Sequence, residues 1–148
     1  MGGVSYAVSE INLADHMIYV TLPLLDDKRV FINAVGHMGN AFRTVIKAFF
    51  EREYRFKRVS FLPPDDLVTG EFLNRYINKL GLSVYLDMVK NVNCFNDVRA
   101  KSSIKLKRND QFIIISPEYS MTALSIPQVK DYLRLGKEFV AKMGDLLK

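Results

Sequence analysis

The sequence predicts a mainly α protein, an up-and-down bundle of four to five helices with a small antiparallel β-hairpin or meander before the last helix. Two patterns indicate this fold. Residues 28–57 carry apolar side chains at helical spacing, and the period changes to two after residue 104. The 148 residues are 49% hydrophobic and 25% charged, with no long linker, so one domain over residues 1–148 is expected.

Residues 28–57 form the most informative segment, because their apolar positions span an arc of about 200° around one helix. A helix of this kind must be packed by neighbours on more than one side. Gly36 and Gly39 lie inside it, where they are expected to let another helix approach closely. The apolar seam consists of Phe31, Val35, Met38, Phe42, Val45 and Phe49. The polar side of the helix, opposite the apolar arc, carries Asn33, His37, Asn40, Thr44 and Lys47.

The first helix is expected to begin after Ser9, whose hydroxyl can accept hydrogen bonds from the first-turn amides. Pro23 is expected to end or kink this helix. Asp26 and Asp27 then favour the positive end of the long helix, so an antiparallel helical hairpin is predicted. The expected buried positions of the first helix are Ile11, Ala14, Ile18 and Leu22.

A third helix is predicted after Asp65, which is expected to provide its side-chain cap. Gly81 is the expected stop, and a fourth helix resumes at Leu82, with a bend at Gly81 as the competing assignment. The expected buried positions are Phe72, Leu73, Tyr76, Ile77 and Leu80 in the third helix, and Leu82, Tyr85, Leu86, Val89, Val92 and Phe95 in the fourth.

The segment from Ile104 alternates apolar and basic residues, and Asn109-Asp110 supplies a two-residue turn, so a β-hairpin is predicted. A turn at Pro117 and a third short strand at 121–124 would extend it into a meander. Ser125 and Gln128 have the spacing of a capping box and announce the last helix. Its expected buried face is Val129, Leu133, Phe139, Val140, Met143 and Leu147.

Charge and cysteine usage limit the function classes. A net charge of +5 and a pI near 9.3 favour contact with polyanions. The single cysteine, Cys94, excludes an intramolecular disulfide framework and a CxxC zinc site, so a reducing cytoplasm fits best. No segment is apolar enough to cross a bilayer, and the first residues indicate neither export nor lipidation. The sequence predicts no cofactor and no metal site.

Basic residues gather in two clusters, the first of which is interleaved with Tyr54 and Phe56. Lys and Arg neutralise phosphates while aromatic rings stack on exposed bases, a combination suited to RNA. The alternative is that these cations only stabilise helix ends and protect a strand edge. The clusters are Arg52, Arg55, Lys57 and Arg58, and Arg99, Lys101, Lys105, Lys107 and Arg108.

The polar stripe of the long helix is the other candidate site. Its members are Asn33, His37, Asn40 and Thr44, which are spaced four, three and four residues apart and therefore share one face of the helix. This face can be explained as a ligand pocket, as an interface or as a solvated helix back. No local pattern joins a nucleophile, a base and an orienting group. His16 is expected to be a partly buried packing residue and Cys94 a small hydrophobe.

The order of elements resembles that of small archaeal HEPN-like proteins, the higher eukaryote and prokaryote nucleotide-binding bundles. The resemblance depends on residues 104–119 (IKLKRNDQFIIISPEY) running into residues 124–133 (LSIPQVKDYL). It implies an up-and-down bundle, frequent dimers and, in catalytic members, metal-independent RNA cleavage by an Arg followed four to six residues later by His. No Arg precedes His16, and seven residues separate Arg29 from His37, so that motif is missing.

The leading hypothesis is therefore a non-catalytic cytoplasmic binding module for RNA or a nucleotide, acting as a homodimer or with a protein partner. A divergent metal-independent ribonuclease using His37 with Arg43, or with a residue of the dimer mate, is the alternative. A structural subunit for another protein is the third hypothesis.

Overall fold

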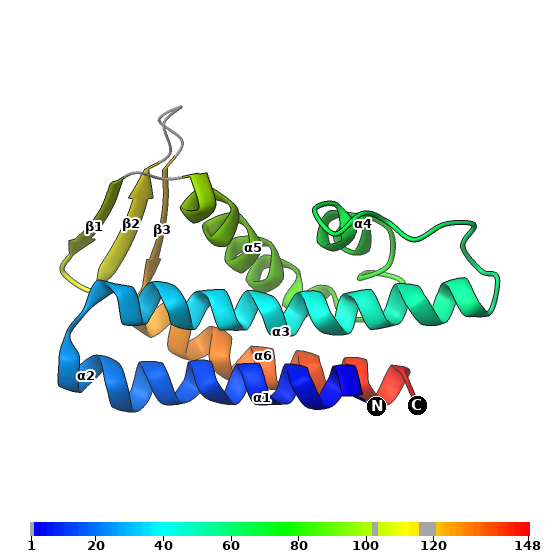
Figure 1. Cartoon of the computed structure of the whole chain (residues 1–148), viewed down its shortest axis with the longest axis horizontal. Coiled ribbons are helices and arrows are strands. Elements are labelled where there is room, and N and C mark those ends of the chain that lie inside the picture. Colours follow the sequence, from blue (N-terminus) through cyan, green and yellow to red (C-terminus); the bar gives the residue numbers. More distant parts are fainter. Residues whose placement is uncertain (1, 102–103, 116–120) are drawn as a thin grey trace.

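The computed structural model describes residues 2–101, 104–115 and 121–148, and it confirms the predicted fold class (Figure 1). A helical bundle is joined to a three-stranded antiparallel sheet that precedes the last helix. The elements are α1 (Gly2–His16), a π-helical turn (Met17–Thr21), α2 (Leu22–Leu25), α3 (Lys28–Arg55), α4 (Val68–Arg75), a 3-10 turn (Ser83–Tyr85), α5 (Leu86–Lys101), β1 (Ile104–Arg108), β2 (Gln111–Ile115), β3 (Met121–Ser125) and α6 (Ile126–Leu146).

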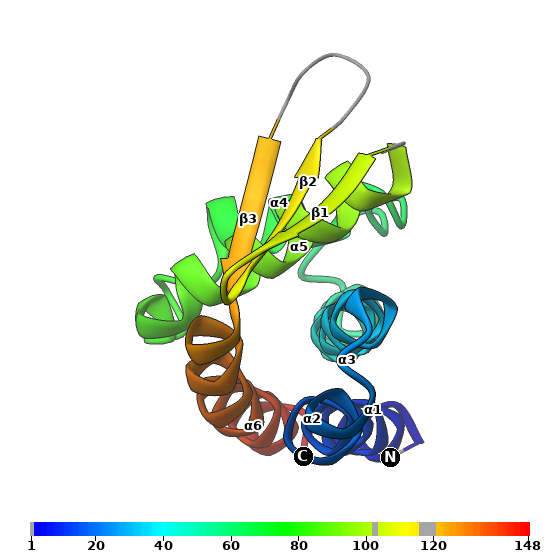
Figure 2. The same cartoon turned by 90° about the vertical axis from the view of Figure 1, so that its left-hand side faces the viewer.

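The long helix α3 is the central element, as its broad apolar arc predicted. In the end-on view it lies between α1 on one side and α5 on the other, and α6 closes the bundle (Figure 2). The predicted seam is buried along its whole length, from Phe31 to Phe49. The helix ends at Arg55, two residues earlier than predicted, because the backbone turns through a positive φ of 60° at Lys57.

The predicted start of the first helix was wrong. Helix α1 begins at Gly2, and Ser9 is an exposed position inside it. The helix extends further because Ala7 and Val4 continue the face of Ile11 into the core. The predicted burial of Ile11, Ala14, Ile18 and Leu22 is confirmed.

Pro23 does not end the first helical segment. The chain widens into the π-helical turn just before it, and the segment then continues as α2 to Leu25. A wider turn relieves the clash between a proline ring and the preceding turn of the helix. Asp26 then adopts a left-handed conformation, and the Asp27 carboxylate accepts from the Arg29 amide at 2.9 Å as the N-cap of α3.

The predicted cap at Asp65 was also wrong, because α4 begins at Val68 and Asp65 pairs with Lys47 of α3 at 3.0 Å. The helix ends at Arg75, before the expected stop at Gly81. Tyr76 leaves the helical path, and its ring packs edge-on against two phenylalanine rings of α3. The distances between ring centroids are 5.1 Å to Phe49 and 5.4 Å to Phe50. Tertiary packing therefore overrides the local helical period here.

The predicted meander is present and buries one face against the bundle. Phe112 and Ile114 of β2 and Leu124 of β3 are buried, and the Phe112 ring stacks on Phe31 of α3 at 3.9 Å. Asn109 has a φ of 57°, as the predicted two-residue turn requires. The capping box is confirmed by the Gln128 amide donating to the Ser125 hydroxyl at 3.1 Å. The turn predicted at Pro117 lies outside the described residues.

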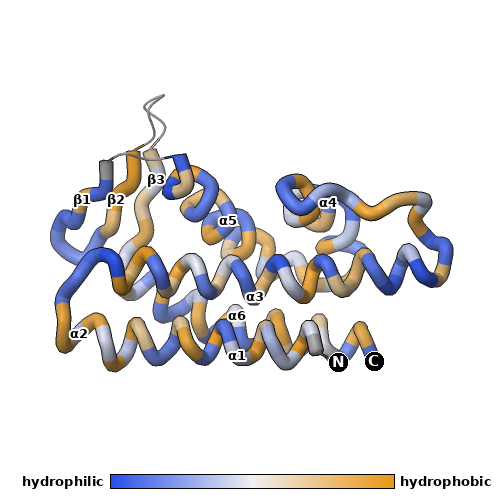
Figure 3. Tube along the Cα trace, viewed as in Figure 1, coloured by the Kyte–Doolittle hydropathy of each residue, from blue (hydrophilic) through white to orange (hydrophobic). Residues whose placement is uncertain are grey.

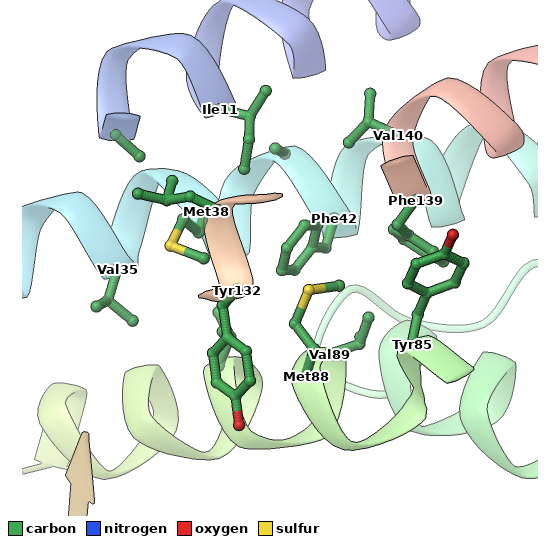
Figure 4. Packing of buried hydrophobic residues seen from close by; sticks show 14 of the residues in the cluster. Ile11, Val35, Met38, Phe42, Tyr85, Met88, Val89, Tyr132, Phe139 and Val140 are labelled. Carbon is green, nitrogen blue, oxygen red and sulfur yellow. The ribbon is translucent and has the colours of Figure 1, made fainter. Parts of the chain in front are cut away.

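Helices α1, α3, α5 and α6 contribute to one core, and Figure 4 shows Ile11, Phe42, Met88 and Phe139 converging from them. The Phe42 and Phe139 rings meet edge to face at 5.6 Å. The predicted buried face of α6 is confirmed from Val129 to Leu147.

Apolar and polar residues alternate along the longer helices, so the colours of Figure 3 change repeatedly along α1, α3 and α5. Over residues 2–101, 104–115 and 121–148, no helix is long and apolar enough to cross a membrane. The predictions for His16 and Cys94 were wrong, since both side chains are exposed on outward faces of α1 and α5.

Candidate binding groove between α3 and α5

Part of the polar back of α3 lines an open groove. The groove lies between α3 and α5 and has a volume of about 320 Å³. Three of the four predicted stripe residues line it, Asn33, His37 and Asn40. The remaining lining residues are Gly36, Gly39 and Arg43 from α3, and Asn93, Asn96, Asp97 and Arg99 from α5.

Two glycines of α3 let α5 approach closely, as the sequence predicted. The amide of Asn96 lies directly against Gly39 and donates from Nδ2 to the Val35 carbonyl at 3.1 Å. One turn earlier, the Arg99 guanidinium occupies the space beside Gly36. The floor of the groove is therefore fixed by a side chain of α5 that binds the backbone of α3.

Gly39→Ala is expected to lower the free energy of unfolding by up to about 2 kcal/mol, because its Cβ overpacks this contact at a cost of about 1 to 3 kcal/mol and helix propensity offsets up to about 1 kcal/mol of it. The new Cβ would lie 2.3 Å from Asn96 Nδ2, so the amide would have to leave the Val35 carbonyl. Gly70→Ala in α4 is the control, because a Cβ there meets nothing within 4 Å. That variant is expected to gain up to about 1 kcal/mol from helix propensity. Urea denaturation of both variants checks the prediction, and equal effects would contradict it.

Two guanidinium groups enter the groove from opposite walls. Arg43 donates to Asn40 Oδ1 at 2.9 Å, and Arg99 donates to Asn33 Oδ1 at 3.2 Å. Each guanidinium has five N–H donors, so these contacts leave most of them available to a ligand. Asp97 is the acidic residue that lines the groove, so Arg43, Arg99 and Asp97 together carry a formal charge of +1.

His37 is held by a carboxylate that the sequence analysis did not single out. Its Nδ1 lies 2.8 Å from Oε2 of Glu10, which reaches it from α1. The other carboxylate oxygen accepts from Asn40 Nδ2 at 3.2 Å and from the Tyr6 hydroxyl at 2.9 Å. Glu10 is only 9% exposed, and among the described residues no partner contacts His37 Nε2. This network fixes the histidine ring at the edge of the groove.

The network keeps Glu10 ionised. Burial raises the pKa of the Glu10 carboxyl, but hydrogen bonds from Tyr6 and Asn40 and the nearby His37 outweigh it, so the pKa lies below its ordinary value. The pKa of Tyr6 is raised because its hydroxyl donates to that carboxylate. Both shifts favour a charged carboxylate with a neutral phenol beside it.

The fourth stripe residue, Thr44, does not join the groove. Its hydroxyl donates to the Asn40 carbonyl one turn earlier in the same helix, at 2.7 Å. This is the ordinary local bond of a threonine inside a helix. The candidate ligand stripe is therefore Asn33, His37 and Asn40, completed by residues of α5.

The first basic cluster lies at the C-terminal end of α3, and two of its members make intramolecular contacts. Arg52 donates to the Leu146 carbonyl at 2.7 Å, at the end of α6, and Arg58 pairs with Glu53 at 2.6 Å. Both guanidiniums also lie against the Phe56 ring. Arg55 and Lys57 are exposed. These contacts favour the helix-end explanation for Arg52 and Arg58, and RNA binding by the cluster stays a prediction.

The second basic cluster lies at the other end of α3, on α5 and the edge strand β1 (Figure 1). Arg99 lines the groove, and Lys107 forms an ion pair with Asp26. Lys101, Lys105 and Arg108 are exposed. The two clusters are therefore separated by the length of α3, and only the second is contiguous with the groove through Arg99.

A larger cavity of about 460 Å³ lies between the start of α1 and the end of α3. Val4, Ala48, Leu62 and Leu147 give it mostly apolar walls, and its Arg52 is already bonded to the end of α6. We favour the smaller groove as the functional site, because polar side chains from two helices converge there.

Comparisons with protein-family models, with curated proteins and with solved structures gave no match.

Proposed function

We propose that this protein is a non-catalytic binding module that holds RNA or a nucleotide in the groove between α3 and α5. The observation that carries the proposal is the meeting of Arg43 and Arg99 with the Asn33, Asn40 and Asn96 amides around one cavity. Its volume of about 320 Å³ is at the lower end for small-molecule sites. A binding role is also what the resemblance to HEPN-like proteins implies for a chain without the cleavage motif.

The lining chemistry suits a phosphate joined to a base. Guanidinium groups bind phosphate oxygens through paired N–H donors, and Arg43 and Arg99 provide two of them. An asparagine amide both donates and accepts, so Asn33 and Asn93 can pair with the edges of an unstacked base. Asp97 adds an acceptor for exocyclic amino groups.

Fluorescence anisotropy with a short labelled RNA and with a labelled nucleotide, across a salt series, tests the proposal. Wild type is expected to bind at low salt, and Arg43→Ala and Arg99→Ala are each expected to weaken binding. For RNA, each substitution should flatten the salt slope by about one unit per lost phosphate contact. Absence of binding to both probes at low salt would refute the proposal.

The control variant separates the groove from the first basic cluster. A triple variant in which alanine replaces Arg55, Lys57 and Arg58 loses three cations at the far end of α3. If the groove binds the probes, this triple variant retains more affinity than either single groove variant. The opposite order would assign RNA binding to the first cluster, as the sequence hypothesis also allowed.

A divergent ribonuclease is the second candidate, and the Glu10–His37 contact favours it. A carboxylate that orients Nδ1 leaves Nε2 to act on a bound phosphodiester, and Arg43 lies in the same groove. Incubating labelled RNA with wild type and His37→Ala tests this candidate. Cleavage that survives the substitution, or no cleavage at all, excludes it.

A further inference from the structure

The connection between α3 and α4 gathers exposed apolar side chains at one end of the molecule. Over residues 54–64, which we call the α3–α4 tip, Tyr54 is 49% exposed, Phe56 59%, Phe61 66% and Leu62 45%. Figure 1 shows the tip projecting past the ends of α1, α4 and α6. The tip therefore presents large apolar side chains at the outermost end of the bundle.

The tip is also rich in positive charge. Residues 54–64 contain three cations, Arg55, Lys57 and Arg58, and no acidic residue. Arg58 pairs with Glu53 at 2.6 Å. Within residues 2–101, 104–115 and 121–148, Arg55 and Lys57 have no ion-pair partner, and both side chains are exposed. Two cations of the tip are therefore free to meet an anionic partner.

Phe56 combines the apolar and the cationic feature at one position. The guanidinium carbons of Arg52 and Arg58 lie 5.8 Å and 5.1 Å from the centroid of its ring. The ring still stays more than half exposed. Long basic side chains that flank an apolar group in this way can stay in water while the group enters an apolar phase.

Charge and apolar exposure together indicate the kind of partner. Surfaces that lie on anionic bilayers combine Lys and Arg, which attract the headgroups, with Phe and Leu, which enter the interface. RNA would also attract the cations, and aromatic rings stack on its bases, but an aliphatic side chain such as Leu62 has no stacking role. A projecting tip also reaches a flat bilayer without a clash from the rest of the bundle (Figure 1).

We propose that the α3–α4 tip binds the surface of bilayers that contain anionic lipids. Its exposed phenylalanines and Leu62 enter the interface, while Arg55 and Lys57 contact lipid phosphates. The tip is separate from the groove between α3 and α5, because no residue of the tip lines that groove. Two free cations and a few apolar side chains give reversible attachment that weakens as salt rises.

Co-sedimentation of the full chain with vesicles tests the proposal. Wild type is expected to pellet with phosphatidylglycerol vesicles and to stay in solution with phosphatidylcholine vesicles. The double variant Arg55→Gln, Lys57→Gln should bind about 25-fold more weakly, about fivefold for each cation. Lys101→Gln, Arg108→Gln is the matched control, because it removes the same charge from exposed positions near the other end of α3. It should bind nearly as wild type does, since salt screens distant charges.

A single tryptophan reports whether the tip enters the bilayer, because the chain contains no other. The emission of Phe61→Trp is expected to shift to the blue when phosphatidylglycerol vesicles are added, and brominated lipids should quench it. Leu24→Trp is the control, since Leu24 is 79% exposed on α2, at the opposite end of α3. Its emission should not shift. Circular dichroism of each variant should match that of wild type.

Three results overturn the proposal. The first is a wild-type protein that stays in solution with phosphatidylglycerol vesicles, and RNA binding that Arg55→Gln, Lys57→Gln then loses would assign the tip to RNA. The second is an equal loss of vesicle binding in Lys101→Gln, Arg108→Gln, which would mean that only net charge matters. The third is pelleting without a blue shift at residue 61, because the apolar side chains would then stay outside the bilayer.

Discussion

Replacing Phe139 with alanine is expected to lower the free energy of unfolding by about 3 to 5 kcal/mol, a large part of the stability of an ordinary domain. The side chain is fully buried, at 0% exposure. Its ring contacts three other aromatic rings. The distances between ring centroids are 5.6 Å to Phe42 of α3, 5.6 Å to Tyr85 of the 3-10 turn and 6.3 Å to Phe72 of α4. Three separate parts of the chain therefore lose contacts around one cavity.

Chemical denaturation followed by circular dichroism measures this effect. Phe61→Ala is the control, since Phe61 is 66% exposed, and it should change stability by less than about 0.5 kcal/mol. A loss below about 1 kcal/mol for Phe139→Ala would mean that the core collapses around the vacancy, or that the ring is not central to it.

Glu10→Gln is expected to lower the free energy of unfolding at neutral pH by about 1 to 3 kcal/mol, because it removes the charge that receives three hydrogen bonds. Two of those bonds come from His37 and Asn40 and join α1 to α3, and the third comes from Tyr6 within α1. The amide keeps the size of the carboxyl but presents one acceptor oxygen in place of two. Glu51→Gln on the exposed side of α3 is the matched control and is expected to be nearly neutral.

The effect of Glu10 should depend on pH in one direction. Its pKa is lower in the folded protein than in the unfolded chain, so the carboxylate stabilises the fold above the unfolded pKa of about 4.3. This stabilisation is lost as the pH falls through the lowered folded pKa. Wild type and Glu10→Gln should therefore converge in stability at acidic pH. A difference that grows on acidification would contradict the assigned network.

The fold was largely predictable because its strongest signals are local. The apolar arc of α3 and the capping box of Ser125 and Gln128 depend on spacing within one element, and both are confirmed. The errors arose where distant contacts decide the local structure. Tyr76 leaves the helical path to pack on α3, and Val4 and Ala7 extend α1 because α3 and α6 bury them.

The groove was half predictable. Asn33, His37 and Asn40 follow from helical spacing alone, but their partners come from other helices. Glu10 lies 27 residues before His37, and no sequence period relates α1 to that face of α3. Gly36 and Gly39 were the signal that a helix would pass there, although they do not say that it would bring Asn96 and Arg99.

The stacked rings of Phe31 and Phe112 have a consequence for the order of folding. They join the start of α3 to a strand near the other end of the chain, so most of the polypeptide forms the loop between them. Closing so long a loop loses chain entropy before the contact can stabilise it, whereas the α1–α3 hairpin closes a short loop. Amide protection in the sheet should therefore develop after that of the helical hairpin. Of the two edge strands, β1 should lose protection first, because its residues 105–108 are exposed whereas β3 packs on α5 and α6.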